Sequence, residues 1–226
     1  MDEHITRRSS IVRIGGLVAG ALAAGGLDAA SSDGAGPAGV ASGVVKCVLT
    51  PELTEGPYYV ANERVRRNIT EGRPGTPLTL RTSVVDASTC RAVKNAAVDI
   101  WHCDALGVYS GVQGNTGTFM RGIQRTNAQG LAVFKTVYPG WYMGRAVHIH
   151  VKVHIGGSVV HTGQLFFPDT LTDAVYKAAP YDTRGARDVR NASDSIYRNG
   201  GSRGMLSIHR SGAGYVAAIA MGVHRS

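Results

Sequence analysis

The chain has 226 residues, a formal net charge of +8 and a hydrophobic fraction of 43%. This length suits one domain with a full hydrophobic core plus a short leader, and no internal repeat or second domain is visible. Lysine and arginine do not form runs interleaved with aromatic residues, so the positive charge does not indicate nucleic-acid binding. We attribute the charge to general solubility, although a basic surface can also attract anionic aromatic acids or a polyanionic matrix.

The N-terminus predicts an export signal. Arg7 and Arg8 are adjacent, and residues 14–27 form an apolar stretch rich in glycine and alanine. That stretch is too short for a membrane span, and the pattern is typical of a twin-arginine signal. An ordinary secretory signal or a disordered N-terminus is the alternative. We expect a signal peptide and flexible linker over residues 1–41, a secreted protein without an integral membrane span, and one domain over residues 42–226.

The domain reads mainly as β-strands. Residues 78–85 alternate polar and apolar side chains, a turn follows, and residues 97–102 are the expected hairpin partner. Further strand patterns follow at residues 130–137, 147–155, 158–167, 205–210 and 215–223. Short strands separated by turns indicate an all-β fold, an antiparallel β-sandwich with long loops at one end.

Two more hairpins and a helix complete the predicted elements. Gly156 and Gly157 separate two of the strands, which is a strong hairpin signal. The last two strands form a closing hairpin around residues 211–214. Residues 171–179 predict a short helix with Thr170 as its candidate cap, so the sandwich is expected to carry one or two short helices.

Two histidines in a predicted strand raise the question of a metal site. His148 and His150 lie two residues apart, so both side chains point to the same face. Tyr142 lies upstream in a turn-rich stretch that can bend back over that face. A phenolate is a hard anionic ligand that favours ferric iron, whereas imidazole suits iron, copper and zinc alike. A His-x-His pair alone is more often part of a half-buried strand, and His154, on the same face, is the main rival ligand.

Four motifs occur in order at residues 49–59 (LTPELTEGPYY), 98–109 (VDIWHCDALGVY), 121–130 (RGIQRTNAQG) and 139–150 (PGWYMGRAVHIH). Together they resemble the intradiol ring-cleavage dioxygenases, the relatives of catechol and protocatechuate dioxygenases. The likeness is greatest to a single-chain secreted branch seen in actinobacteria. It is strong over residues 47–169 and weaker in the tail.

The resemblance implies a non-haem Fe(III) centre and assigns its ligands to Tyr109, Tyr142, His148 and His150. In this family a catechol-type aromatic diol and O2 are the substrates. The ring opens between the two hydroxylated carbons and gives a cis,cis-muconate-type product. Tyr142 would also act as a base that accepts a substrate proton.

The resemblance also implies two pocket residues: Arg145 would stabilise negative charge on the ring, and Gln164 would orient the substrate. From its position after Gly56 and Pro57, Tyr58 is expected to line the mouth of the pocket. A surface salt bridge, a cross-strand hydrogen bond and a structural aromatic are the respective alternatives. One departure is visible, because the usual Arg-Pro-Ala-His lead-in here runs from Arg145 through Ala146 to His148. Losing the proline loosens the lead-in but removes no chemical group.

Two other functions are compatible with the sequence. One is a non-catalytic secreted β-sandwich that binds a polysaccharide or another protein; the other is a zinc or copper site built from the histidines alone. The preferred catechol and the oligomeric state are left open. Cys47, Cys90 and Cys103 allow one disulfide in an exported protein, but the sequence does not fix the pairing. Cys103 could instead be a small buried hydrophobe.

Overall fold

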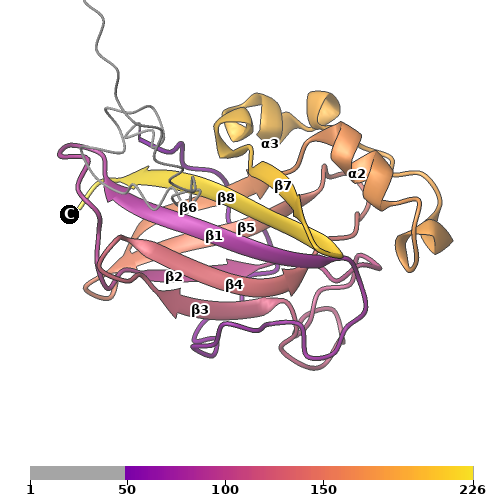
Figure 1. The fold of residues 1–226 in the computed structure, drawn as a ribbon, viewed down its shortest axis with the longest axis horizontal. Coiled ribbons are helices and arrows are strands. Elements are labelled where there is room, and N and C mark those ends of the chain that lie inside the picture. Colours follow the sequence, from indigo (N-terminus) through magenta and orange to yellow (C-terminus); the bar gives the residue numbers. More distant parts are fainter. Residues whose placement is uncertain (1–48, 226) are drawn as a thin grey trace, which may run out of the picture. The chain divides into compact units, whose positions relative to one another are not determined.

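The computed structural model describes residues 49–225, so the predicted signal peptide, the linker and Cys47 lie outside the described residues. Eight strands form two four-stranded sheets that lie one over the other (Figure 1). The first sheet has the order β4-β1-β8-β7 and contains β1 (Pro77–Asp86), β4 (Leu131–Val137), β7 (Ser207–Ser211) and β8 (Gly214–Val223). The second has the order β3-β2-β5-β6 and contains β2 (Ala97–Trp101), β3 (Arg121–Arg125), β5 (His148–Ile155) and β6 (Ser158–Phe166).

The core lies between the sheets and follows from the alternation of side chains. In β1 every second residue is buried, and Leu78, Leu80 and Val84 join the main hydrophobic cluster. In β5 the odd-numbered residues, including Ile149 and Val151, belong to the same cluster. Because successive side chains of a strand point to opposite faces, the even-numbered residues of β5 lie on the outer face of its sheet. That outer face carries both histidines of the predicted site.

The sandwich predicted from the sequence is confirmed, with two corrections to its pairing. Strands β1 and β8 pair in parallel, so the first sheet is mixed rather than wholly antiparallel. The predicted hairpin between residues 78–85 and 97–102 is wrong, because β1 pairs with β4 and β8 while β2 belongs to the other sheet. Alternation shows which residues of a strand face the core, but it does not show which strand lies beside it. The hairpins β5–β6 and β7–β8 are confirmed.

Short helices lie together at one end of the sandwich (Figure 1). They are α2 (Asp169–Val175), α3 (Ser195–Arg198) and three 3₁₀ turns, η1 (Tyr181–Arg184), η2 (Asn191–Ser193) and η3 (Gly201–Gly204). The prediction of Thr170 as a cap is wrong, because α2 begins after Pro168 and has no side-chain cap. A proline suits this position, since the first turn of a helix does not need its N–H. In contrast, Asp194 caps α3 by accepting from the backbone N–H groups of Ile196 and Tyr197.

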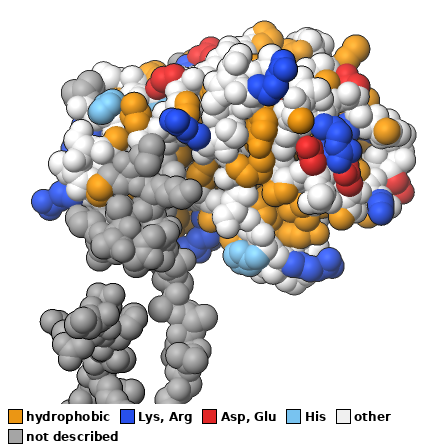
Figure 2. Space-filling view, turned by 90° about the horizontal axis from the view of Figure 1, so that it is seen from above, with side chains coloured by type: hydrophobic (Ala, Val, Ile, Leu, Met, Phe, Trp, Pro, Cys, Tyr) orange, Lys and Arg blue, Asp and Glu red, His pale blue; other side chains and the backbone are white. Residues whose placement is uncertain are grey.

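The described surface is mixed in character. On the face shown in Figure 2, Lys and Arg side chains stand apart from one another, and some lie beside Asp or Glu. No helix within residues 49–225 combines the length and the apolar character of a membrane-spanning segment. Cys90 is disulfide-bonded, and Cys103 is a buried free thiol whose Sγ lies 3.2 Å from the Gly140 carbonyl oxygen. The interpretation of Cys103 as a small buried residue is confirmed.

Candidate metal centre

Strand β5 presents His148 and His150 side by side on its outer face, where both are almost fully buried. The Nδ1 of His148 lies 2.6 Å from the Ala146 carbonyl oxygen, which can only accept a hydrogen bond. Nδ1 therefore carries the proton in the neutral ring, and Nε2 keeps a free lone pair. The His150 ring stacks on Trp101 of β2 with centroids 4.8 Å apart and planes 8° from parallel. Both imidazoles are thus fixed before any ligand binds.

The loop before β5 brings a tyrosine to the same point. The Tyr142 hydroxyl lies 3.1 Å from His148 Nε2, and His148 Nε2 lies 3.0 Å from His150 Nε2. The ring of Tyr109, a residue only 3% exposed, packs edge-on against that of Tyr142 with centroids 5.4 Å apart. The Tyr109 hydroxyl is buried and has no hydrogen-bond partner. Two phenols and two imidazoles therefore converge, as the sequence predicted.

Burial keeps the four side chains neutral. It lowers the pKa of His148 to about 3 and that of His150 well below its ordinary value. It also raises the pKa of Tyr142 to about 12 and that of Tyr109 well above its ordinary value. The site offers a buried phenol without a hydrogen-bond partner and an imidazole whose lone pair is held in place. A hard, highly charged cation would bind both groups, because such a cation favours phenolate over phenol. This donor set fits Fe(III).

Arg145 and Gln164 meet beside this cluster. The Arg145 Nη2 donates to Gln164 Oε1 at 2.5 Å, and the Gln164 amide donates to the Thr54 carbonyl at 2.9 Å. Gln164 also lies directly opposite His150 in the β5–β6 register. Arg145 is half-buried rather than a surface residue, and its Nε bonds the buried carboxylate of Asp194 at 2.9 Å.

Tyr58 packs over the two tyrosines of the cluster. Its ring centroid lies 4.6 Å from that of Tyr109 and 6.0 Å from that of Tyr142. Its hydroxyl accepts a hydrogen bond of 3.1 Å from the Gln113 amide. Nearby, Gly56 adopts a left-handed φ of +72°, and a Cβ there would lie 3.2 Å from His150 Cε1. The segment around residues 56–58 thus forms part of the wall of the site.

The other histidines near the site in sequence take different roles. His154 is half-buried, and it pairs with Ala97 at the far end of the β2–β5 ladder, whereas His150 pairs with Trp101. His102 is fully buried between the Cys103 carbonyl at 2.7 Å and the Thr136 hydroxyl at 2.8 Å. Its place is structural. The hydrogen bonds of His102 go to Cys103 and Thr136 rather than to the tyrosine–histidine cluster.

The sequence did not reveal two residues that shape the site. Asp194 lies far from the motifs, and its only local signal is that of a helix cap preceding Ser195. Trp101 is the other, because its stacking on His150 depends on the register between β2 and β5. Neither contact follows from spacing along the chain.

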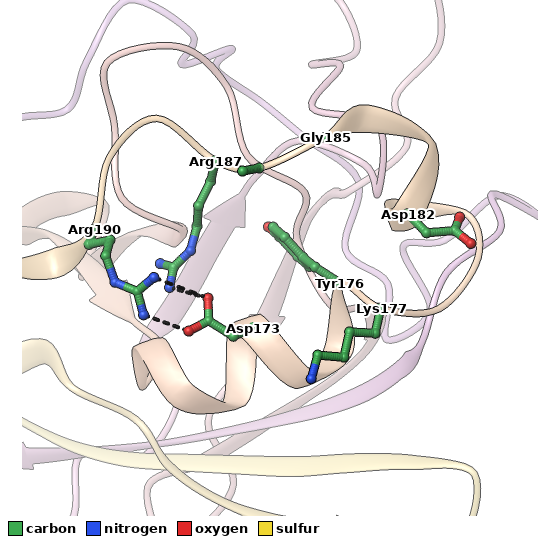
Figure 3. Close-up of a pocket in the computed structure, with 8 residues that line it drawn as sticks. Asp173, Tyr176, Lys177, Asp182, Gly185, Arg187 and Arg190 are labelled. Carbon is green, nitrogen blue, oxygen red and sulfur yellow. Dashed lines mark hydrogen bonds and ion pairs between the residues drawn. The ribbon is translucent and has the colours of Figure 1, made fainter.

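A second concavity lies apart from this centre. It is lined by residues of α2 and of the segment after it, among them Tyr176, Lys177, Arg187 and Arg190 (Figure 3). Asp173 accepts from Arg187 at 2.8 Å and from Arg190 at 2.5 Å. No residue of the tyrosine–histidine cluster lines it. These ion pairs tie the segment around residues 185–190 to α2.

Comparison with known proteins matches this site to a family. A protein-family model described as Dioxygenase covers residues 54–195, which is more than half of the chain. The structure is similar to an intradiol ring-cleavage dioxygenase from Tetranychus urticae, with a TM-score of 0.75 and 32% identity over 79% of this chain and 95% of that one. The chain belongs to the intradiol ring-cleavage dioxygenases. The prediction of this family from the four motifs is confirmed.

Further relatives of this intradiol dioxygenase differ in length. The dioxygenase domain of a carbohydrate-binding fusion protein from Streptomyces sp. SirexAA-E has a TM-score of 0.63 and 28% identity, over 79% of this chain and 99% of that one. The catechol 1,2-dioxygenase 2 of Acinetobacter lwoffii is 34% identical over 110 residues, which are 46% of this chain and 38% of that enzyme. This chain therefore matches well under half the length of that curated relative.

Proposed function

We propose that this protein is a ferric dioxygenase that cleaves catechol-type diols between their hydroxylated carbons. The observation that carries the proposal is the convergence of three side chains, since His148 Nε2 lies 3.1 Å from the Tyr142 hydroxyl and 3.0 Å from His150 Nε2. The buried, unpartnered hydroxyl of Tyr109 beside them supports a fourth ligand. Neither a polysaccharide-binding sandwich nor a site made of histidines alone requires a buried and a half-buried tyrosine there.

Tyr109, Tyr142, His148 and His150 would hold the iron. Bound Fe(III) would acidify coordinated phenols and activate the chelated diol toward O2. The chain itself supplies the proton transfer: Tyr142 is the half-buried tyrosine and lies in a loop, so its Oη can accept a substrate proton. His148 and His150, held by a carbonyl and by Trp101, keep their positions while this proton moves.

The remaining pocket residues would bind and orient the diol. Arg145 places a positive charge beside the cluster, where it can stabilise negative charge that develops on the ring. Gln164 fixes the guanidinium through its Oε1 and is itself held by the Thr54 carbonyl. Tyr58 offers an aromatic face that can pack against the substrate ring and exclude water. Relatives named as catechol dioxygenases support catechol itself as the first substrate to examine.

We also propose that the protein is exported. The adjacent Arg7 and Arg8 and the apolar stretch after them support a twin-arginine leader. The disulfide at Cys90 supports an oxidising destination, because such bonds persist mainly outside the cytoplasm. Mass analysis of the protein in culture medium would test this, with Arg7→Lys/Arg8→Lys as the variant that should stay in the cell. Equal export of that variant would contradict a twin-arginine route.

An oxygen electrode with a panel of catechols tests the enzymatic proposal. The iron-loaded protein should consume one O2 per diol, and the product mass should equal that of the diol plus both oxygen atoms. Ultraviolet spectra separate a muconate from the semialdehyde of extradiol cleavage. Tyr142→Phe should abolish uptake, whereas His154→Ala should retain it. Absence of uptake by the iron-replete wild type would leave the non-catalytic sandwich as the better description.

A further inference from the structure

The carboxylate of Asp194 is buried at the point where the lead-in to β5 meets the start of α3. Its side chain is only 1% exposed. One oxygen, Oδ2, accepts from Arg145 Nε at 2.9 Å and from the Ala146 backbone N–H at 2.8 Å. The other, Oδ1, accepts from the backbone N–H groups of Ile196 at 2.8 Å and Tyr197 at 3.0 Å. Four donors therefore share one carboxylate, two on each oxygen.

This arrangement needs an ionised carboxylate. Burial acts to raise the pKa of Asp194, but the hydrogen bonds from Ala146 and Tyr197 and the charge of Arg145 hold it below its usual value. An asparagine could cap α3 with its one carbonyl oxygen, and its NH2 group would then face the donors of Arg145 and Ala146. The cap would survive such a change, whereas the bond to the guanidinium would not.

The same carboxylate holds the lead-in to strand β5. Arg145 and Ala146 immediately precede Val147 and the first histidine, and Ala146 also provides the carbonyl that fixes His148 Nδ1. The Ala146 N–H that bonds Asp194 exists because this position is not a proline, which has no amide hydrogen. Where a proline would stiffen the lead-in, this chain uses a hydrogen bond to a distant carboxylate.

Asp194 is itself held in place by the segment that precedes it. Arg187 bonds Asp169 at 2.5 Å, and the Asn191 backbone N–H lies 3.3 Å from the same carboxylate. The Asn191 amide donates to the Phe167 carbonyl at 2.8 Å. Together with the Arg187–Asp173 pair shown in Figure 3, these contacts fasten residues 187–191 to α2 and to the end of β6. The carboxylate is thus supported by rigid elements rather than by a free loop.

We propose that Asp194 is a positioning residue, which holds the Arg145 guanidinium against Gln164 and toward the substrate. The inference rests on the proposed function, since it assigns Asp194 a role through Arg145 in that same site. The hydrogen bonds of the Asp194 carboxylate go to Arg145, Ala146, Ile196 and Tyr197, not to the tyrosines or histidines of the centre.

The first test compares Asp194→Asn with Asp188→Asn. Asp188 lies in the same segment and accepts from the Gly144 N–H at 2.8 Å, but it is exposed and its hydrogen bond goes to Gly144 rather than to Arg145. Asp194→Asn should lower kcat for catechol by about 10- to 100-fold, because a misplaced orienting group costs that order of rate. Its iron content should remain near that of the wild type. Asp188→Asn should change kcat by less than about twofold, and Asp194→Glu should recover part of the loss by restoring the charge.

A double-mutant cycle shows whether Asp194 acts through Arg145. In an Arg145→Ala background, Asp194→Asn should lower kcat by less than about threefold further, because its target is already gone. Full multiplication of the two losses would overturn the proposal, and so would wild-type kcat in the single Asp194→Asn variant.

A measurement without iron or substrate distinguishes failure of the positioning role of Asp194 from failure of the proposed dioxygenase function. In the metal-free protein with ¹⁵N-labelled arginine, the Nε–H of Arg145, assigned from its absence in Arg145→Ala, should exchange slowly with solvent. It should exchange at least about tenfold faster in Asp194→Asn, since a buried charge-assisted bond is lost. The same rate in both proteins would refute the positioning role. If the wild type proves inactive yet this difference is found, the positioning stands and the catalytic proposal fails.

Discussion

At the scale of single residues, the centre combines groups that are neutral without a cation. Burial, with a smaller contribution from the charge of Arg145, lowers the pKa of His148 and His150 and keeps their imidazoles unprotonated, and burial also opposes ionisation of Tyr109 and Tyr142. Free imidazole lone pairs and acidifiable phenols are therefore ready for a metal at neutral pH. The positive charge of Arg145 stands just outside this set and does not compete for the metal. The residues divide into metal-binding groups and one group that acts on substrate charge.

Arg145→Ala should separate these two tasks. We expect kcat to fall by about 10²–10³-fold, because a preorganised charge facing the ring is lost. The iron content and the visible spectrum of the resting protein should stay unchanged, since the guanidinium is not a ligand. Steady-state kinetics with metal analysis of the same samples checks this. Loss of iron together with activity would show that Arg145 supports the ligands instead.

A second residue-scale prediction concerns Asp99, on the outer face of β2. Burial raises the pKa of its carboxyl to about 7, and Tyr59 donates to one oxygen at 3.2 Å while the other has no partner. The folded state therefore keeps a proton that the unfolded state releases near pH 4. The stabilisation that this retained proton gives to the folded state is complete below about pH 4. It is lost as the pH rises through about 7, the pKa of Asp99 in the folded state.

Asp99→Asn should remove this dependence, because the amide stays neutral. Between pH 5 and pH 8 the free energy of unfolding of the wild type should fall relative to that of the variant, by an amount on the order of a few kcal/mol at most. Urea unfolding of both proteins across this range measures the difference. Parallel pH curves would show that Asp99 does not hold a proton in the folded state.

At the scale of elements, residue spacing predicted which side chains share one face of a strand. It did not predict which side chains of different strands lie in contact. His148 and His150 were placed on one face by the period of the strand, and the β5–β6 hairpin by its two glycines. The pairing of β1 with β8 in parallel and the stacking of Trp101 on His150 depend on long-range register. Asp194 was missed for the same reason. Side chains joined across the fold leave no periodic signal.

The segment that contains Gly56 and Gly72 crosses the outer face of the second sheet, and these two glycines give a prediction at the scale of elements. Gly56 and Gly72 both have left-handed φ angles, +72° and +76°. A Cβ on Gly56 would press on His150 at 3.2 Å, whereas one on Gly72 would meet nothing within 4 Å. Alanine at either position should cost about 1 kcal/mol of stability through backbone strain. Only Gly56→Ala should also weaken iron binding.

Thermal unfolding and a chelator titration of both variants separate the two effects. Gly72→Ala measures the strain alone, so its iron affinity should equal that of the wild type. Equal iron affinity in Gly56→Ala would mean that His150 yields to the new methyl group without cost. The close approach would then be unimportant for the centre.

At the scale of the whole molecule, the sandwich separates stability from chemistry. Its core lies between the sheets, while His148 and His150 lie on the outer face of one sheet, with Tyr142 in the loop before it. The helical segment after α2 covers one side of the site and contains Asp194. A site built outside the core can change its loops without loss of the fold, because loops contribute little to the packed interior. Relatives with 32% and 28% identity share this architecture over 79% of the chain.

The visible absorption spectrum of the purified, iron-loaded protein tests the central claim most directly. Two tyrosinates on one Fe(III) should give a burgundy protein with a broad band near the middle of the visible range. Tyr109→Phe and Tyr142→Phe should each weaken or shift that band, and His154→Ala should leave it unchanged. A colourless protein that contains one iron per chain would contradict the joint binding of iron by these four side chains.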